Sequence, residues 1–256
     1  MNYEITRLPD YPMRTAVLLS GGLDSAVLLA EEVARDEVQP IQPIYVSVGL
    51  AWERAERAIV EQLLAAAPVV GRVRPLASLT VDMGDVYPPA HWAIQGAPPK
   101  YHTPDEDVYL PGRNVILLAK AGIYCAAAQI DRIVIGTLGH NPFPDATPEY
   151  RAAMARALSL GLAHELQIDA PYSNASKADI VRRGMTLGVP FELTLSCMKP
   201  STPPAPPAPL EPLEPLEPLE RFRHCGTCSK CRERHDGFLE AGVPDPTDYA
   251  VREYTS

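Results

Sequence analysis

The chain has 256 residues and a formal net charge of −9; 46% of its residues are hydrophobic and 21% are charged. This composition excludes a disordered tail and a disulfide-knotted miniprotein, and the acidic charge argues against a general basic face for nucleic acid. No apolar stretch approaches the ~20 residues of a membrane helix. The opening MNYEITRLPD lacks the apolar core of a secretory signal, so we expect a cytoplasmic protein.

The first predicted unit is a strand, a tight turn and a helix. Residues 15–20 (TAVLLS) form a short apolar run with branched side chains, which is typical of a buried parallel strand, and two glycines close it. A helix follows from Asp24 to Arg35, with apolar residues at helical spacing. The pattern then repeats, with a strand over 43–48, an amphipathic helix over 52–67 and a weaker strand over 73–81.

The middle of the chain contains a long irregular segment. Residues 82–112 are rich in proline, glycine and tyrosine without any period, which predicts a loop, and loops of this length are usually functional or mobile. A buried helix is expected over 114–130, with Asn114 as its N-cap. The next strand, DRIVIGTL, ends at Gly136, and a polar, proline-rich loop continues to Asp145.

Two further helices carry start signals. Thr147 precedes a proline and a glutamate, which predicts a helix to about residue 160. Ser176, with Asp179 three residues later, begins another helix that stops at Gly188. Alternating strands and helices predict an α/β fold, a Rossmann-like doubly wound parallel sheet, with an active site at the carboxyl ends of its strands.

The composition changes near the C-terminal quarter. Residues 200–220 contain nine prolines, and Pro-Leu-Glu occurs four times from Pro209. The segment is expected to be extended polyproline II with a leucine edge and a glutamate edge, serving either as a docking ligand for a partner or as a low-complexity spacer. We therefore divide the chain into a large unit, 1–196, and a small C-terminal element, 197–256.

The motif SGGLDS, residues 20–25, lies between the first strand and the first helix. Its glycines let the backbone approach a ligand, and free amides together with the helix dipole form an anion site, for which phosphate is the expected guest. The motif is neither a Walker loop nor a dinucleotide fingerprint. Beside a phosphate, Asp24 would cap backbone amides or act through magnesium.

Three thiols lie within seven residues, at Cys225, Cys228 and Cys231. In a reducing compartment, the five cysteines of the chain predict metal binding or burial rather than disulfides. A tetrahedral structural zinc needs four ligands, so the triplet predicts a zinc site with one more residue. An iron–sulfur cluster is the alternative, because close triplets also suit clusters.

The fourth ligand must come from elsewhere in the chain. We choose Cys197, in SCMKP. A metal shared with the triplet would then close the proline-rich segment into a loop and pin the tail to the sheet. His224 and His235 are the alternatives. Cys125 lies in an alanine-rich helix and is expected to be an ordinary buried thiol.

SGGLDS resembles the pyrophosphate loop of the N-type ATP pyrophosphatase superfamily, whose members cleave ATP to AMP and pyrophosphate while activating a carbonyl or carboxylate. With LPGRN, FPDATPE, SKADIVRRG, and SC followed by CGTCSKCRERHDGFLEAGVPDPT, nearly the whole chain resembles the 7-cyano-7-deazaguanine synthase family. The resemblance implies an ATP-dependent carbon–nitrogen ligase that joins ammonia to 7-carboxy-7-deazaguanine, using one ATP to adenylate the acid and a second to dehydrate the amide to a nitrile. It also implies a structural zinc, magnesium with the ATP, and a homodimer.

The resemblance also assigns roles to positions of this chain. ATP binding falls to Leu19, Ser20, Gly21, Gly22, Leu23, Asp24 and Ser25. Asp24 and Lys177 would be catalytic, the lysine neutralising the carboxylate or the leaving pyrophosphate. Substrate binding falls to Arg113, Asn114, Asp145 and Glu149. The alternatives are a helix cap and a surface arginine at 113–114, a turn cap at Asp145 and a solvated lysine at 177.

Two stretches depart from the family pattern. Residues 47–52 read SVGLAW where the family usually has Asp-Tyr-Gly-Gln-Arg-His, and the chain after Gly136 reads TLGHNPFPD without the usual Asp-Tyr-Ser-Gly. Both lie at strand ends, where ligands bind, so ATP use is better supported than the acceptor and the nucleophile. A divergent paralogue that adenylates a deazapurine acid and passes it to another amine is therefore one alternative.

Two other functions compete with this reading. An ATP-dependent enzyme of transfer RNA modification would predict a basic groove and a cluster or catalytic thiol, and the acidic charge speaks against it. A nucleotide-binding scaffold without enzymatic activity would use the Pro-Leu-Glu repeat to recruit its partner.

Overall fold

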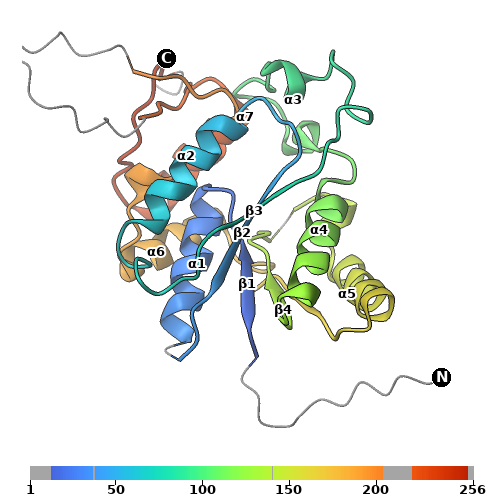
Figure 1. Cartoon of the computed structure of the whole chain (residues 1–256). Coiled ribbons are helices and arrows are strands. Elements are labelled where there is room, and N and C mark those ends of the chain that lie inside the picture. Colours follow the sequence, from blue (N-terminus) through green and yellow to red (C-terminus); the bar gives the residue numbers. More distant parts are fainter. Residues whose placement is uncertain (1–12, 37, 140, 204–220, 253–256) are drawn as a thin grey trace, which may run out of the picture.

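The computed structural model describes residues 13–36, 38–139, 141–203 and 221–252. Within these ranges five strands form one parallel sheet in the order β3-β2-β1-β4-β5 (Figure 1). The strands are β1 (Thr15–Leu18), β2 (Gln42–Ser47), β3 (Ala77–Thr80), β4 (Arg132–Val134) and β5 (Gln167–Asp169). The chain winds outward from β1 to β3 and then returns to β4 on the other side of β1. The direction in which successive strands are added therefore reverses between β1 and β4, while all five strands stay parallel.

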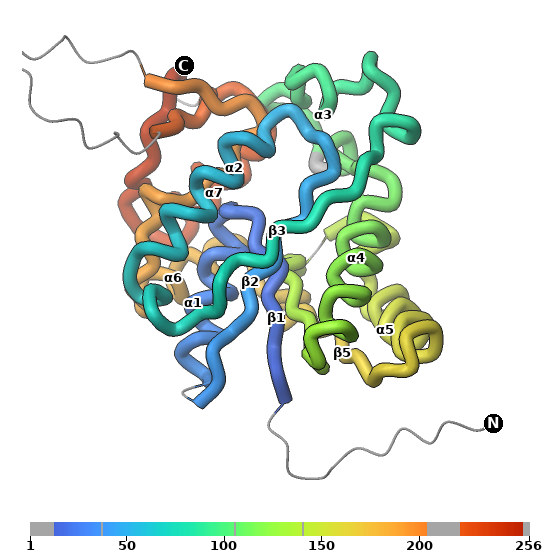
Figure 2. The backbone as a smooth tube through the Cα atoms, viewed as in Figure 1, coloured from blue at the N-terminus to red at the C-terminus, as the bar shows by residue number. Residues whose placement is uncertain are grey.

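Helices cover both faces of the sheet, which confirms the predicted doubly wound fold. In the described ranges they are α1 (Leu23–Arg35), α2 (Glu53–Leu64), α3 (Trp92–Gln95), α4 (Arg113–Ala127), α5 (Pro148–Leu162), α6 (Lys177–Leu187) and α7 (Ser229–Ala241). Helices α1 and α6 pack together on one face and α4 and α5 on the other (Figures 1 and 2). None of the helices in this part of the chain has the length and apolar character to span a bilayer.

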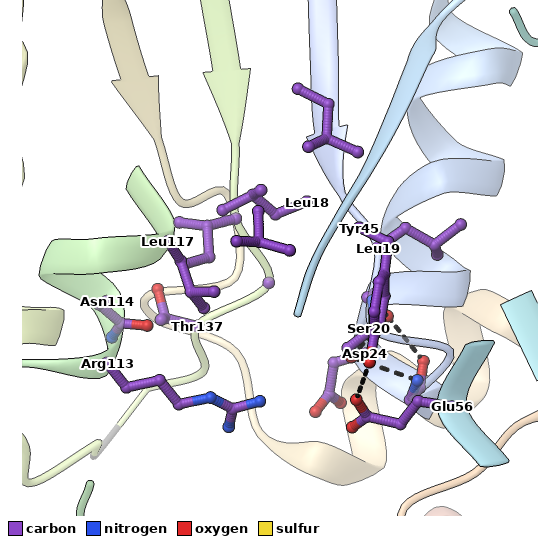
Figure 3. A pocket seen from close by; sticks show the side chains of 16 residues that line it. Leu18, Leu19, Ser20, Asp24, Tyr45, Glu56, Arg113, Asn114, Leu117 and Thr137 are labelled. Atoms are coloured by element: carbon purple, nitrogen blue, oxygen red, sulfur yellow. Dashed lines mark hydrogen bonds between the residues drawn. The ribbon is translucent and has the colours of Figure 1, made fainter. Parts of the chain in front are cut away.

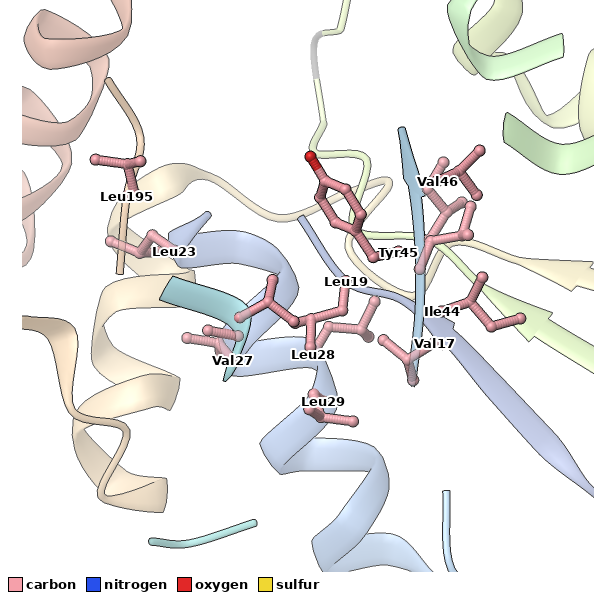
Figure 4. Packing of buried hydrophobic residues seen from close by; sticks show 14 of the residues in the cluster. Val17, Leu19, Leu23, Val27, Leu28, Leu29, Ile44, Tyr45, Val46 and Leu195 are labelled. Atoms are coloured by element: carbon pink, nitrogen blue, oxygen red, sulfur yellow. The ribbon is translucent and has the colours of Figure 1, made fainter. Parts of the chain in front are cut away.

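The core is built around β1. All four of its residues are buried, because it is flanked by β2 and β4 and covered by helices on both sides. Val17, Leu28 and Ile44 are fully buried in this cluster (Figure 4). Burying one such side chain stabilises the fold by about 1.5–3 kcal/mol, so a rigid central strand holds the turn that follows it.

The predicted caps of α5 and α6 are confirmed. The Thr147 hydroxyl accepts the Tyr150 amide at 3.1 Å, and Ser176 and Asp179 form a reciprocal capping box. The expected N-cap at Asn114 is wrong, because Gly112 is the N-cap of α4 with a left-handed φ of 76°. A glycine adopts that conformation without strain, which starts the helix before Asn114.

The segment predicted as one long loop is more ordered than its composition indicates. It contains α3 and a 3-10 turn, Asp105–Val108. Met83, Tyr87 and Val108 are buried in the core cluster. Side-chain burial therefore fixes a segment that has no hydrophobic period in its sequence.

The C-terminal element packs on the sheet domain through α7, which lies against α6. Arg234 is 1% exposed, and its guanidinium donates to the Thr247 and Thr194 hydroxyls at 2.6 and 2.7 Å and to the Phe191 carbonyl at 2.9 Å. Breaking such a buried charged network costs several kcal/mol, so it anchors α7 firmly. The sequence patterns predict neither α7 nor β5.

The proline-rich insertion begins and ends at a closed base. The Ser201 amide donates to the Arg223 carbonyl at 3.1 Å, and the Arg223 amide donates to the Ser201 carbonyl at 2.8 Å. Residues 204–220, most of the predicted polyproline II segment, lie outside the described residues.

Candidate functional site

The SGGLDS loop, residues 20–25, is called the phosphate loop after its predicted ligand, and it turns sharply between β1 and α1. Gly21 has a φ of +77°, and a Cβ there would lie 3.1 Å from a side chain of α2, so glycine is the residue that fits. The Ser20 hydroxyl accepts the Gly22 amide at 3.3 Å, and the Ser25 hydroxyl accepts the Ser20 amide at 3.2 Å. These bonds hold the loop at the N-terminus of a helix, the arrangement that binds anions.

One ammonium group joins three helices beside the phosphate loop. Lys177, at the start of α6, places Nζ 2.6 Å from Asp24 Oδ2 on α1 and 2.6 Å from Glu233 Oε1 on α7. Burial opposes the charge on Lys177, but the two carboxylates outweigh it and raise the pKa of the ammonium. Burial raises the pKa of Asp24, with Lys177 acting against it. Lys177 is therefore charged at neutral pH.

Asp24 and Arg113 each carry a buried polar atom without a hydrogen-bond partner among the described residues, Asp24 Oδ1 and Arg113 Nε. Arg113 extends from α4 across the cavity toward the loop and α2 (Figure 3). Buried polar atoms are normally satisfied, and exceptions call for a ligand or ion. The unsatisfied atoms therefore point to an anion near Arg113 and a cation or proton near Asp24.

Glu56 of α2 faces the same cavity (Figure 3). Its carboxylate accepts the Tyr45 hydroxyl and the Trp52 indole N–H, both at 3.0 Å. Burial, partly offset by Arg113, raises the pKa of Glu56 to about 7. Near neutral pH this carboxyl can therefore take up or release a proton next to the phosphate loop.

An apolar cavity of about 210 Å³ opens beside the phosphate loop. It lies at the carboxyl ends of β1, β2 and β4, where the strand order reverses and ligands of doubly wound sheets bind. Its apolar walls include Leu19, Ile44, Val46, Leu117 and Ile135. Such walls suit a planar base whose phosphates extend to the loop.

A second cavity, of about 430 Å³, adjoins the first and is lined by two stacked aromatic pairs. The ring centroids of Trp52 and Trp92 are 5.9 Å apart, and those of Tyr109 and Phe143 are 4.9 Å apart. Trp52 belongs to the first departure from the family pattern and Phe143 to the second. Both departures therefore line the cavity where an acceptor would lie.

Asn114 and Asp145 bind each other at the edge of this second cavity. The Asn114 amide donates to Asp145 Oδ2 at 3.1 Å, and Asn114 Nδ2 donates to the Asp145 carbonyl at 3.1 Å. Asp145 thus supplies the cap of α4 from a distant loop. Glu149 lies exposed on the first turn of α5 and lines neither of these two cavities.

The structure brings together the four cysteines chosen from the sequence. The sulfur atoms of Cys197, Cys225, Cys228 and Cys231 all lie within 4.8 Å of one another. A tetrahedral zinc with bonds of about 2.3 Å places its sulfurs about 3.8 Å apart, and the Cys225–Cys231 and Cys228–Cys231 distances are 3.8 and 3.5 Å. This cluster could hold a metal ion.

The other candidate ligands are engaged elsewhere. His224 Nε2 accepts the Ser196 amide at 3.0 Å, and His235 Nδ1 lies 3.4 Å from the Tyr101 hydroxyl. Cys125 is buried in α4, and burial raises the pKa of its thiol to about 12. Among the described residues, the four-sulfur group includes none of these three side chains.

Sequence reasoning missed several side chains of the site, namely Glu56, Trp92, Lys230 and Glu233. For Glu56 a signal exists, because it shares the apolar face of its helix with Trp52 and Ile59, and a carboxylate in an apolar stripe is unusual. The other three have no such signal. Trp92 lies in the irregular segment. Lys230 lies between Cys228 and Cys231 and Glu233 follows them, in a stretch whose pattern is dominated by the cysteine spacing.

Fold and site together define an α/β protein with a glycine turn at the sheet switch point, an adjoining cavity lined by aromatic side chains and a four-cysteine cluster. The family model "QueC: Queuosine biosynthesis protein QueC" matches residues 14–242. The chain belongs to this family, which confirms the resemblance and the predicted enzyme class, a ligase of queuosine biosynthesis.

Curated relatives carry the name 7-cyano-7-deazaguanine synthase. The protein of Thermoplasma volcanium is 32% identical over 256 residues, 93% of this chain and 92% of that one. The protein of Anaeromyxobacter dehalogenans is 33% identical, with 93% of this chain and 96% of that one covered. The protein of Azoarcus sp. is 32% identical, with 96% and 100% covered.

Proposed function

We propose that the protein converts 7-carboxy-7-deazaguanine and ammonia to 7-cyano-7-deazaguanine with two molecules of ATP. In the first step the acid displaces pyrophosphate from ATP, and ammonia then displaces AMP to give the amide. In the second step the amide oxygen displaces pyrophosphate from a second ATP, and loss of AMP and protons then leaves the nitrile. The observation that carries the proposal is the phosphate loop at the switch point, opening into two adjoining cavities in a member of the QueC family.

On the ATP side, the proposed roles follow from the loop and its neighbours. Residues 19–25 bind the phosphates through backbone amides and hydroxyls, and the apolar cavity takes the adenine. Lys177 and Arg113 neutralise charge on the carboxylate and the leaving pyrophosphate, which preorganised cations do well in a buried site. Asp24 is the residue that would hold the magnesium accompanying ATP, because its buried Oδ1 has no partner in the described ranges.

On the acceptor side, we propose that the planar acid lies among the aromatic side chains of the second cavity. Asp145 and Asn114 face this cavity while bonded to each other. A carboxylate has further acceptor capacity, so Asp145 can still receive hydrogen bonds from an amidine edge. The main contribution of these residues is to position the acid beside Asp24 and Arg113 for attack on ATP.

We propose zinc for the four-cysteine cluster. Four thiolates in a closed tetrahedral set are the usual ligands of structural zinc, which supplies folding energy and leaves no open coordination position. Metal analysis should find one zinc per chain, lost in Cys228→Ser and kept in the control Cys125→Ala. Iron with visible absorbance would instead identify a cluster.

We also propose a division at residue 197, a homodimer and a cytoplasmic location. Light scattering of the purified full chain tests the dimer, since a monomer mass at micromolar concentration would contradict it.

The enzymatic proposal is tested by mass spectrometry of a reaction with magnesium ATP, ammonium and 7-carboxy-7-deazaguanine. We expect two AMP for each nitrile, and AMP formation should disappear in Asp24→Asn. Formation of no AMP by the wild-type protein would reject this acid as the substrate.

The departures at Trp52 and Phe143 favour a second candidate, in which the adenylated acid passes to an amine other than ammonia. Both side chains line the acceptor cavity, so they alter the part of the site that selects the reactants. AMP and amide without nitrile, or AMP without either base product, would support this candidate over the synthase reaction.

A further inference from the structure

Helix α7 forms one wall of the cavity above the phosphate loop. A third cavity, of about 200 Å³, is lined by Ser20, Gly22 and Asp24 on one side and by Lys230 and Glu233 on the other. The segment that carries three of the four cysteines therefore also reaches the region proposed for ATP.

Helix α7 carries cysteines on one face and charged side chains on another. Cys228 is the N-cap and Cys231 lies in the first turn, and both belong to the four-sulfur group. Lys230 and Glu233 are also three residues apart, so they share a different face. Their Nζ and Oε2 atoms are 2.5 Å apart.

The same face of α7 holds Lys177 in place. Glu233 Oε1 lies 2.6 Å from Lys177 Nζ. At Gly237, four residues further on, a Cβ would lie 2.2 Å from Lys177 Cγ, so the bare glycine makes room for the lysine stem. Helix α7 thus provides both a counter-charge and a slot for a side chain that also binds Asp24.

Three cations line this cavity, namely Lys177, Lys230 and Arg113. Lys230 is the one whose ion pair lies wholly within the C-terminal element, and a third of its side chain is exposed. An ammonium on a flexible stem can swing from a carboxylate to a phosphate, because it acts as a point charge without a fixed bonding plane.

We propose that Lys230 contacts the phosphates of bound ATP and that Glu233 is a positioning residue that holds Lys177 and Lys230 on the phosphate side. The inference rests on the proposed ATP-dependent function and extends it. The cysteine-bound segment would then supply part of the nucleotide site and not only stability.

The test measures the dissociation constant of magnesium ATP by calorimetry on the full chain. Lys230→Ala should weaken binding about 10-fold or more, the usual loss for a hydrogen bond to a charged group, and Lys230→Arg should stay within about 3-fold of wild type. Lys199→Ala is the matched control, because Lys199 is an exposed lysine of the same element that lines none of the three cavities. All variants should keep the metal content of wild type.

The positioning role of Glu233 is tested by a measurement that the loss of a purely structural contact would leave unchanged. In Glu233→Ala we expect the KM for ATP to rise and kcat to fall, each about 10-fold, while the KM for the acid and the metal content stay unchanged. Glu233→Asp should recover at least a third of the activity. A parallel rise in both KM values, or no recovery by aspartate, would overturn the positioning role.

The proposed reaction and the inference about Lys230 can be disproved separately. If wild type binds ATP but forms no nitrile, the proposed reaction fails, and the Lys230 inference is still decided by the same dissociation constants. Equal ATP binding by Lys230→Ala and Lys199→Ala overturns the inference even when wild type forms the nitrile. A wild-type protein that binds no ATP overturns both.

Discussion

The proposed phosphate side and the proposed acceptor side of this site are built from different parts of the polypeptide. On the phosphate side a turn of six residues presents glycines, amides and hydroxyls from one short stretch of chain. On the acceptor side, aromatic rings come from distant segments, as Trp52, Trp92 and Phe143 show. Backbone chemistry at a turn tolerates few alternatives, whereas a wall of side chains can change its selectivity without changing the fold. This difference explains why the family pattern survives at the loop and departs at the cavity.

The largest effect is expected when the turn itself is altered, because ATP binding should then be lost. Gly21→Ala should weaken ATP binding by about 100-fold or more, because losing two charge-assisted hydrogen bonds costs about 3–6 kcal/mol. The control is Gly188→Ala, which has a similar φ of +69° but nothing within 4 Å of its Cβ. Calorimetry with ATP should separate the two variants, while unfolding should show about 1–2 kcal/mol of backbone strain in both and a further loss in Gly21→Ala, whose Cβ would crowd α2. Equal ATP affinity in the two would contradict the assignment of the loop.

Substitutions in the aromatic cavity should have smaller effects, and these should appear in the KM for the acid and not in the KM for ATP. Trp92→Ala should raise the KM for the acid about 10-fold, since stacking of a base on an aromatic ring is worth about 1–3 kcal/mol. The KM for ATP should change less than about 3-fold. Trp92→Phe keeps a ring and should keep most of the affinity for the acid. Steady-state kinetics would refute the separation of the two sides if both KM values rose together.

Replacing Asp145 tests whether a side chain that caps α4 also binds the acid. Asp145→Ala removes the acceptor for the Asn114 amide and should lower the free energy of unfolding by about 1–2 kcal/mol, as cap losses do. It should also raise the KM for the acid severalfold. Thr147→Ala removes the cap of α5 at a similar cost in stability, and its KM should not change. Urea unfolding and kinetics of the pair decide between a cap alone and a cap that also binds.

The smallest change in activity is expected at Glu56, which lines the first cavity and accepts a hydrogen bond from Trp52 of the second. Its pKa is about 7 in the folded protein and near 4.5 when exposed, so the folded state binds the proton more tightly. Stability from this group is therefore full below about pH 4.5 and declines as pH rises toward 7, by about 1.4 kcal/mol per pH unit. Glu56→Gln should remove that decline. Urea unfolding at several pH values checks it, and an unchanged slope would show that Glu56 is not the group responsible.

Much of the fold could be predicted because short stretches of sequence indicate the strands, turns and helix caps that they form. The apolar run of β1, the glycines after it and the capping box at Ser176 each report local structure through a short stretch of sequence. Strand β5 was missed because only Ile168 of its three residues is apolar, whereas β4 is equally short but its Ile133 and Val134 belong to an apolar run. Helix α7 was missed because polar residues and cysteines dominate it, so its apolar contacts with α6 leave little periodic signal.

The residues of the candidate site also fall into two groups, those that the sequence predicts and those that depend on tertiary packing. Spacing predicted the glycine turn and the three thiols of the triplet, since both consist of fixed residue types close together in the sequence. Cys197 lies far from the triplet in the sequence, and only the fold brings its sulfur to the other three. Lys177 was placed by resemblance, but its partner Glu233 is 56 positions away, and such a pairing depends on how α6 and α7 pack. The stacking of Trp52 on Trp92 likewise depends on tertiary structure, which no single segment encodes.

The paired backbone hydrogen bonds between Ser201 and Arg223 have a practical consequence for protein engineering. They fasten the two ends of the insertion to each other, with Cys197 on one side and Cys225 on the other. Chain length beyond such a base costs only about 0.6 kcal/mol per doubling. A reporter domain with adjacent termini could therefore be grafted between residues 204 and 220, and we expect the melting temperature of the host to shift by only a few degrees.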